Sequence, residues 1–124
     1  MRYLTFTEIW KLHDLAISRT GGSYGLLDRS MLGRAVAKPK EDRYPTLFDK
    51  AAVLGWRLEI SEPFVDGNER TAYMAMEVFL LLNGWKVNAS VDEREKMILE
   101  LAEGNLKREE LAKWLECHVQ PQGA

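Results

Sequence analysis

The amino-acid sequence predicts an all-α protein, a compact bundle of helices around one buried central helix at about residues 69–83. Two segments, Thr5–Glu8 and Ser90–Glu93, have the capping-box pattern of a helix start, with Ser or Thr three positions before Glu. Apolar residues behind these starts recur at spacings of three and four. No segment indicates a sheet of any size. The length of 124 residues fits a single domain, 1–124.

The first two helices are bounded by capping and breaking residues. The first begins after Thr5 and ends at Gly21-Gly22, and the second begins near Asp28 and stops at Pro39. Their inward faces are expected to carry Ile9, Leu12, Ala16, Ile17, Leu32, Ala35 and Val36. A polar loop over residues 40–45 follows.

The third and fourth helices flank the most informative loop of the chain. The third opens at Thr46 to Asp49. Its expected buried stripe is Ala52, Val53, Trp56 and Ile60. Pro63 prevents simple continuation, so residues 61–67 are predicted to form a loop. The fourth helix, from about Asn68 to Asn83, is apolar almost all round, which is typical of a central helix.

The C-terminal third reads as two more helices. Gly84 ends the central helix, and residues 85–89 can add one short extended segment. A helix from Ser90 is broken at Gly104-Asn105, and a last helix follows. The two helices carry the apolar residues Met97, Ile98, Leu101, Ala102, Leu106, Leu111, Trp114 and Leu115. We expect the tail, residues 120–124, to be frayed.

Composition excludes several classes of protein. Hydrophobic residues make up 46% and charged residues 29%, as in ordinary globular domains. A net charge of −2 without a long Lys/Arg run argues against nucleic acid as a partner. No apolar stretch reaches the length of about 18 residues that a membrane span requires, and no signal peptide is evident. These features predict a soluble protein without a membrane partner.

The cysteine and histidine content indicates the expected cellular location and argues against a zinc site. The single cysteine, Cys117, cannot form an internal disulfide, so a reducing cytoplasm is the expected location. We expect Cys117 to fill a small apolar space in the last helix. The two histidines, His13 and His118, lie far apart and cannot complete a zinc site with one cysteine. His13 is interpreted as structural and His118 as a surface residue.

Residues 62–70 combine the groups that a phosphate and a metal ion need. Free N–H groups at a helix start attract anions, and Gly67 permits close approach to the main chain. Asp66 can hold Mg²⁺, and Arg70 can clamp phosphate oxygens. Asn68 can orient a phosphate oxygen or a metal-bound water. The simpler alternative is that Asp66 or Asn68 only caps the helix.

This loop, Glu62-Pro63-Phe64-Val65-Asp66-Gly67-Asn68-Glu69-Arg70, resembles the signature of the Fic superfamily, His-Pro-Phe-x-Asp/Glu-Gly-Asn-Gly/Lys-Arg. Six of its nine positions match. Most of the chain is also similar to the death-on-curing (Doc) branch, the toxins of toxin–antitoxin pairs. That similarity lies in residues 1–4, 12–14, 21–22, Gly25, Asp28, 70–72 and 83–84.

The resemblance implies the Fic/Doc fold and transfer from ATP or another nucleotide to a protein hydroxyl. Fic enzymes are mostly AMP-transferases, whereas the Doc branch is associated with phosphorylation of elongation factor Tu, which arrests translation. By position, Asp66 would bind Mg²⁺ and act in catalysis with Arg70. The nucleotide phosphates would lie against Gly67, Asn68, Glu69 and Arg70, while Pro63, Phe64 and Gly67 would shape the loop.

Two positions depart from the signature. Glu62 replaces the histidine that serves the family as general base, and neither histidine of the chain is an obvious substitute. Carboxylates are weaker bases than imidazole, and a negative charge about 5 Å from phosphate costs on the order of 3 kcal/mol. Glu69 stands where Gly or Lys is usual, and it can instead face solvent. Glu62 acting as the base remains an alternative.

The sequence leaves the activity open. Either the chain is a natural member with altered or lost activity, or a lethal toxin has been disabled; a non-catalytic protein that only binds an antitoxin or another protein is the rival hypothesis. Self-silencing Fic proteins carry a Ser/Thr-x-x-x-Glu-Gly/Asn motif. The nearest pair here, Glu103-Gly104, follows Leu99 instead of Ser or Thr. Inhibition is therefore expected from a separate antitoxin chain.

Overall fold

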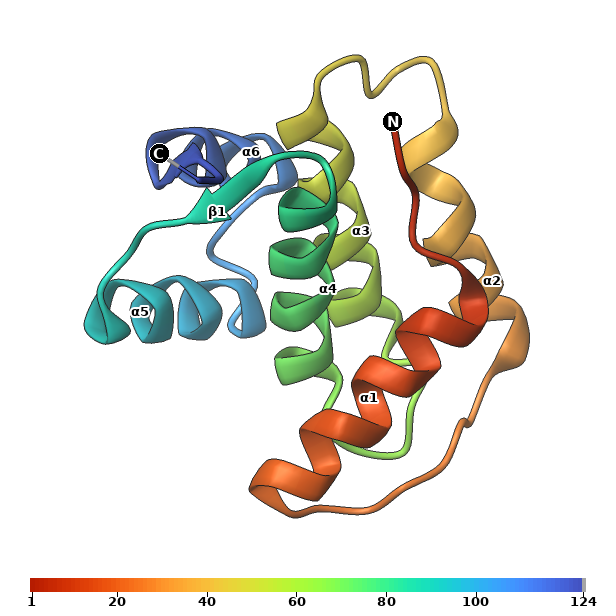
Figure 1. Cartoon of the computed structure of the whole chain (residues 1–124). Coiled ribbons are helices and arrows are strands. Elements are labelled where there is room, and N and C mark those ends of the chain that lie inside the picture. Colours follow the sequence, from red (N-terminus) through yellow and green to blue (C-terminus); the bar gives the residue numbers. More distant parts are fainter. Residues whose placement is uncertain (124) are drawn as a thin grey trace.

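A computed structural model describes residues 1–123 and confirms the predicted all-α class (Figure 1). Among these residues there are six α-helices, one short 3-10 helix and two three-residue strands. The helices are α1 (Phe6–Thr20), α2 (Arg29–Ala37), η1 (Lys38–Lys40), α3 (Leu47–Ser61), α4 (Asn68–Leu82), α5 (Val91–Ala102) and α6 (Arg108–Cys117). The strands are β1 (Trp85–Val87) and β2 (Val119–Pro121).

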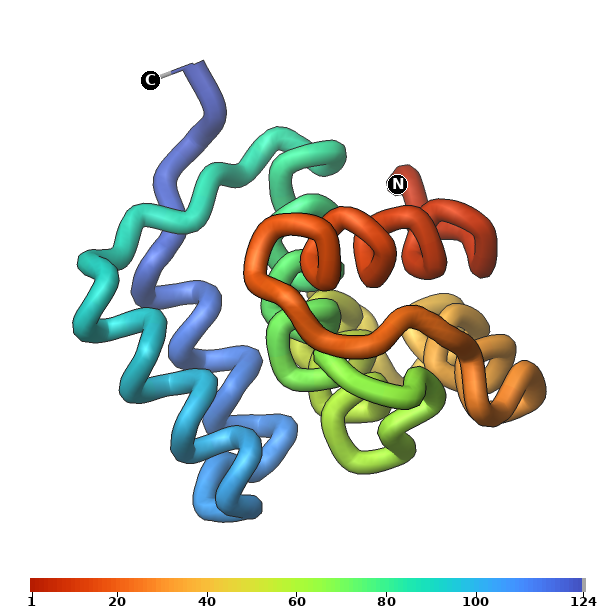
Figure 2. The backbone as a smooth tube through the Cα atoms, turned by 90° about the horizontal axis from the view of Figure 1, so that it is seen from below, coloured from red at the N-terminus to blue at the C-terminus, as the bar shows by residue number. Residues whose placement is uncertain are grey.

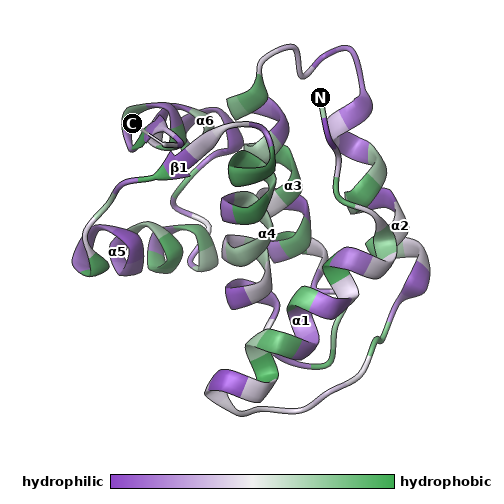
Figure 3. Cartoon of the chain, in the orientation of Figure 1, coloured by the Kyte–Doolittle hydropathy of each residue, from purple (hydrophilic) through white to green (hydrophobic). Residues whose placement is uncertain are grey.

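Helices α3 and α4 form the centre of the molecule and pack more extensively on each other than any other pair (Figure 1). Helix α1 crosses α4, α2 packs on α3, and α6 covers another face of α3. Seen from below, α5 and α6 lie on one side of the central pair, and α1 and α2 lie on the other (Figure 2). The hydropathy colouring shows apolar residues along much of α3 and α4, between these outer layers (Figure 3).

The helix starts follow the predicted local chemistry. The side chains of Thr5, Thr46 and Ser90 each accept a hydrogen bond from the backbone N–H three residues later. In each case the acidic side chain at that later position accepts from the backbone N–H of the cap residue, which completes a capping box. The second helix begins after Asp28, whose carboxylate accepts from Met31 N–H at 3.0 Å.

Three expectations are wrong in detail. Residues 119–121 pair antiparallel with β1, so most of the described tail is ordered by a two-stranded sheet, while residue 124 lies outside the described residues. Ile60 is 50% exposed. It lies two residues, or about 200°, from the buried Leu58, so it points away from the core. Cys117 is exposed at the end of α6 and fills no apolar space.

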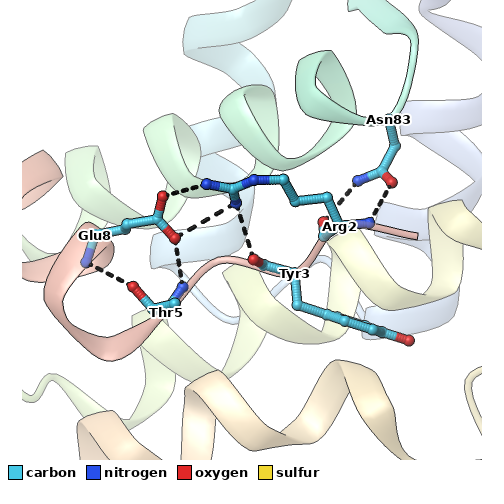
Figure 4. A network of polar contacts seen from close by, with 5 residues as sticks. All are labelled: Arg2, Tyr3, Thr5, Glu8 and Asn83. Atoms are coloured by element: carbon cyan, nitrogen blue, oxygen red, sulfur yellow. Dashed lines mark hydrogen bonds and ion pairs between the residues drawn. The ribbon is translucent and has the colours of Figure 1, made fainter.

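The N-terminal segment is bonded to the start of α1 and to the end of α4 (Figure 4). Arg2 N–H donates to Asn83 Oδ1 at 2.8 Å, and Asn83 Nδ2 donates back to Arg2 O at 2.9 Å. The Arg2 guanidinium also pairs with Glu8 at 2.6 Å. This hydrogen bond from Arg2 is the largest of the effects that lower the pKa of Glu8 to about 2. None of the helices in residues 1–123 has the length and apolar character to span a bilayer.

Helices α3 and α4 approach closely because Gly55 has no side chain. A Cβ at Gly55 would lie 2.6 Å from Cγ of the fully buried Met76 on α4. Every atom of Met76 is covered by neighbours, so its side chain has no free space into which to move. The glycine therefore sets the separation of the two central helices.

We expect Gly55→Ala to destabilise the fold. Overpacking costs about 1–3 kcal/mol, which exceeds the gain of about 1 kcal/mol that alanine brings to a helix. Gly33→Ala on α2 is the matched control: a Cβ there meets nothing within 4 Å, so this variant should gain up to about 1 kcal/mol. Urea unfolding of both variants measures the difference. Equal stability of the two would show that Gly55 does not limit the packing.

Candidate functional site

The loop between the two central helices is the candidate site. Helix α3 ends at Ser61, and Glu62 follows as its C-cap with φ 44° and ψ 60°. Glu62 is the one non-glycine residue in 1–123 with positive φ, a conformation that costs L-residues about 1–2 kcal/mol. Pro63 and Phe64 turn into the core, and Phe64 is 1% exposed. The buried Phe64 therefore anchors the loop in the core.

The segment between α1 and α2 runs beside this loop (Figure 2). Pro63 O accepts hydrogen bonds from Leu27 N–H and Asp28 N–H at 2.8 and 3.1 Å. Val65 N–H donates to Gly25 O at 3.0 Å, and residues 26 and 64 form an antiparallel β-bridge. Gly25 and Asp28, which the family resemblance singled out, therefore brace the loop main chain.

His13 of α1 supports the loop through two contacts. This role is more specific than the structural one that the sequence predicts. Its ring is fully buried on α1 and stacks on Phe64, with 3.9 Å between ring centroids and 3° between planes. Its Nε2 lies 2.7 Å from Asp66 O. A carbonyl oxygen can only accept, so Nε2 carries the proton. The available signal was that His13 shares the apolar stripe of Ile9 and Ala16, where a polar side chain needs a specific partner.

Asp66 and Asn68 are both engaged within the loop. The Asp66 carboxylate accepts from Ser23 N–H at 3.1 Å and from Gly67 N–H at 2.9 Å. Both polar atoms of the Asn68 amide bind the main chain of Phe64, at 3.0 and 2.9 Å. The Asn68 side chain therefore braces the loop in this structure.

The start of α4 offers donors to an anion. The first three N–H groups of the helix, those of Asn68, Glu69 and Arg70, have no hydrogen-bond acceptor among the described residues, and no side chain caps the helix at Gly67. Arg70 is exposed and forms no ion pair within residues 1–123. Three free amides, one free guanidinium and a residue without a side chain are a fitting donor set for phosphate.

A cavity of about 1050 Å³ opens over this loop, and we call it the signature cavity. Its walls come from the ends of α1 and α3, the start of α4 and one face of α5. Five acidic residues line it: Glu59, Glu62, Asp66, Glu69 and Glu95. Only two lining cations, Arg70 and Arg94, oppose them. The main chain is thus arranged for an anion, whereas the side chains give the cavity a negative balance.

Sequence comparison decides the family. The model of the Fic/DOC family matches residues 3–80, more than half of the chain. The chain belongs to the Fic/DOC family. It is 40% identical over 89 residues to Toxin Doc of Mycolicibacterium smegmatis, covering 66% of this chain and 68% of that protein. It is 33% identical over 91 residues to Protein kinase doc of Escherichia phage P1, covering 70% and 72%. These relatives support the Doc branch.

A solved structure supports the Fic fold. The chain is similar to BepC, a VirB-translocated Bartonella effector protein from Bartonella tribocorum, whose crystal structure contains bound AMPPNP. The TM-score is 0.50 at 20% sequence identity, and the match covers 76% of this chain and 49% of that chain. The chain therefore spans about half of the effector, and the likeness shows the shared fold.

The acidic residues around the site affect the pKa of one of their number, Glu59. Burial raises the pKa of Glu59 above its ordinary value, and the negative charges of Glu69 and Glu62 raise it further. Glu59 Oε2 is buried without a hydrogen-bond partner among the described residues. The three glutamates therefore repel one another at the mouth of the loop, and an arriving phosphate would add to that repulsion.

The positive φ of Glu62 predicts a difference between two substitutions. Glu62→Gly and Glu62→Ala remove the same charge, but only glycine adopts this conformation without strain. We expect Glu62→Gly to be more stable than Glu62→Ala by about 1 kcal/mol. Thermal unfolding of the two variants tests the strain directly. If alanine proves equally stable, the strain at position 62 is absent in solution.

Glu59→Gln should alter the pH dependence of stability. Because the folded-state pKa of Glu59 is raised, its stabilising contribution is present below the ordinary value of 4.5 and is lost as pH rises through the raised value. Glutamine removes this loss, so we expect a gain below about 1 kcal/mol at pH 7, limited by solvent screening. The gain should vanish below pH 4.5. Urea unfolding from pH 4 to 8 measures it, with the exposed Glu116→Gln on α6 as matched control.

Proposed function

We propose that this chain is a Doc-type toxin of a toxin–antitoxin pair, built to transfer a phosphoryl or adenylyl group from a nucleotide to a protein hydroxyl in the cytoplasm. The observation that carries the proposal is the set of three free amides at the start of α4 beside the unpaired Arg70, inside a cavity of nucleotide size. The similarity to two Doc proteins, one named as a toxin and one as a protein kinase, supports it.

The chain would hold a nucleotide mainly through its main chain. The amides of residues 68–70 would bind phosphate oxygens, and the Arg70 guanidinium would clamp the same group. Asp66 would share Mg²⁺ with the phosphates and water, because Mg²⁺ needs only one or two protein carboxylates beside them. Bound ATP would supply the transferable group, and the Mg²⁺ ion would offset part of the negative charge of the phosphates and of the cavity. Elongation factor Tu is the protein substrate that the family resemblance favours.

Two side chains oppose this chemistry. Glu62 is exposed at the position of the family base, and Glu69 is exposed in the first turn of α4. A carboxylate at position 62 can accept a proton from the substrate hydroxyl, but more weakly than imidazole. Both charges lie beside the donors of the phosphate site, so they weaken anion binding. We therefore expect low activity in the chain as it stands.

The acidic cavity favours a second candidate function. Five lining acids against two cations would repel a free nucleotide, whereas a basic or apolar segment of a protein would be accepted. On this reading the chain binds an antitoxin or another protein and catalyses nothing. Titration with ATP and Mg²⁺ separates the two: saturable binding that Asp66→Ala abolishes supports the transferase, and no binding at millimolar nucleotide supports the binding protein.

Restoring the family residues tests the transferase directly. We expect Glu62→His, alone and with Glu69→Lys, to raise label transfer from ATP by about 10²–10⁴-fold, the usual contribution of a general base. Transfer from γ-labelled ATP would show phosphorylation, and transfer from α-labelled ATP would show AMP transfer. Growth arrest on expression gives an independent measurement.

The controls separate the site from overall charge. Glu62→His with Glu116→Lys changes the net charge as the double variant does but leaves Glu69 in place. Adding Arg70→Gln to the double variant should abolish transfer. If the double variant folds, binds ATP and still labels no cellular protein, the transferase proposal fails.

A further inference from the structure

A second cavity, of about 430 Å³, lies between η1 with its following loop, α3 and the start of α6. Five of its eight lining residues are cations: Lys38, Arg43, Arg57, Lys107 and Arg108. One acid, Glu109, lines it. Without these six residues, the chain totals of 17 Lys/Arg and 19 Asp/Glu fall to 12 and 18. Cationic charge is therefore concentrated in this basic cavity, while the rest of the protein is acidic.

The basic cavity is separated from the signature cavity by α3. Arg57 faces the basic cavity, and Glu59, two residues later, lines the signature cavity. Two residues correspond to about 200° around a helix, so the two side chains leave opposite faces of α3. The signature cavity has more acids than cations, and the basic cavity has the reverse. Most of the cationic side chains that could bind an anion therefore lie in the basic cavity, on the other side of α3 from the signature loop.

The cations of the basic cavity are held in place by their neighbours. The guanidiniums of Arg43 and Arg108 lie over the ring of the buried Tyr44, at 5.2 and 4.8 Å from its centroid. Stacked guanidiniums lose less freedom when they bind an oxyanion. Arg57 and Lys107 form no ion pair within residues 1–123 and are free to meet one.

The remaining cations are only partly neutralised. Glu41 pairs with Lys38 at 3.2 Å and with Arg43 at 2.8 Å, and Glu109 pairs with Arg108 at 2.7 Å. These pairs lie near the surface, where an ion pair adds little stability. A ligand with two negative charges can therefore displace a carboxylate at small cost. Five cations against these two acids leave an excess of positive charge for it.

We propose that the basic cavity binds a phosphate-bearing small molecule of nucleotide size, with its phosphate on Arg57, Lys107 and Arg108 and its ring on Trp56. Trp56 is half-buried and lines the cavity, which gives the ligand an aromatic surface for stacking. The volume lies within the range of small-molecule sites. Its confinement to one concave patch fits a compact ligand, because a nucleic-acid backbone requires an extended cationic stripe.

Calorimetric titration with ADP in the presence of EDTA tests the proposal. We expect Arg57→Gln with Lys107→Gln to weaken ADP binding by about tenfold or more, because two charge-assisted hydrogen bonds are lost. Lys11→Gln with Lys113→Gln removes the same charge from exposed positions and should bind as the parent chain does. In an Arg70→Gln background, which removes the phosphate clamp proposed for the signature site, Arg57→Gln with Lys107→Gln should cause the same loss of ADP binding. This comparison distinguishes the basic cavity from the signature site and from the proposed transferase.

Two further measurements sharpen the result. Trp56→Leu should weaken ADP but leave inorganic pyrophosphate unaffected, and an equal effect on both would overturn the stacking. Equal ADP affinity in the Arg57/Lys107 variant and its control would overturn the site. Tighter binding of a glutamate-rich peptide than of ADP would also overturn it, since the occupant would then be an acidic protein segment. Circular dichroism checks that each variant is folded.

Discussion

The geometry of the signature loop depends on the burial of one ring pair, Phe64 on His13. Phe64 belongs to the loop and His13 to α1, so their contact ties the loop to a helix 50 residues away in sequence. The same histidine holds Asp66 O, directly before the first free amides of α4. An exposed loop would lose donor alignment through its own conformational freedom. Here two contacts with His13 on α1 and three hydrogen bonds between the loop and residues 25–28 remove that freedom.

Because the donors are backbone amides, the site separates geometry from charge. Substitution of a side chain leaves an N–H in place, so Glu62 and Glu69 change the field around the donors without moving them. This explains how a chain of the Fic/DOC family can keep the loop conformation while its cavity becomes acidic. Burial and, after it, the negative charges of Glu69 and Glu62 raise the pKa of Glu59 in the wall of the cavity. The main chain therefore presents donors to an anion, while three glutamates place negative charge around those donors.

The sequence predicts what is decided locally. Three helix starts were evident because a cap and its acidic partner lie within four residues of one another. The pairing of β2 with β1 was missed because its partner lies more than 30 residues away and both strands are too short for a periodic pattern. The exposure of Cys117 depends on which face of α6 meets α3, and a small residue carries no signal of that choice.

At the candidate site, residue types were predicted better than their roles. Asp66, Gly67, Asn68 and Arg70 all line the cavity, and both polar atoms of the Asn68 side chain form hydrogen bonds with the main chain of Phe64. An amide that can both donate and accept satisfies a polar turn as readily as it binds a phosphate, and spacing alone does not distinguish the two. The specific role of His13 was not predicted, because its partner is a carbonyl group 53 residues away in sequence.

The conformation of Glu62 indicates that the loop geometry is imposed by its neighbours. Glutamate has no preference for positive φ, whereas histidine is among the residues that adopt it more readily. Glu62 N–H still bonds to Leu58 O, and the next two residues are buried, so the chain has no alternative path from α3 into the core. The backbone at position 62 thus has a conformation better suited to histidine than to glutamate. We therefore expect histidine to fit at this position without rearrangement of the main chain.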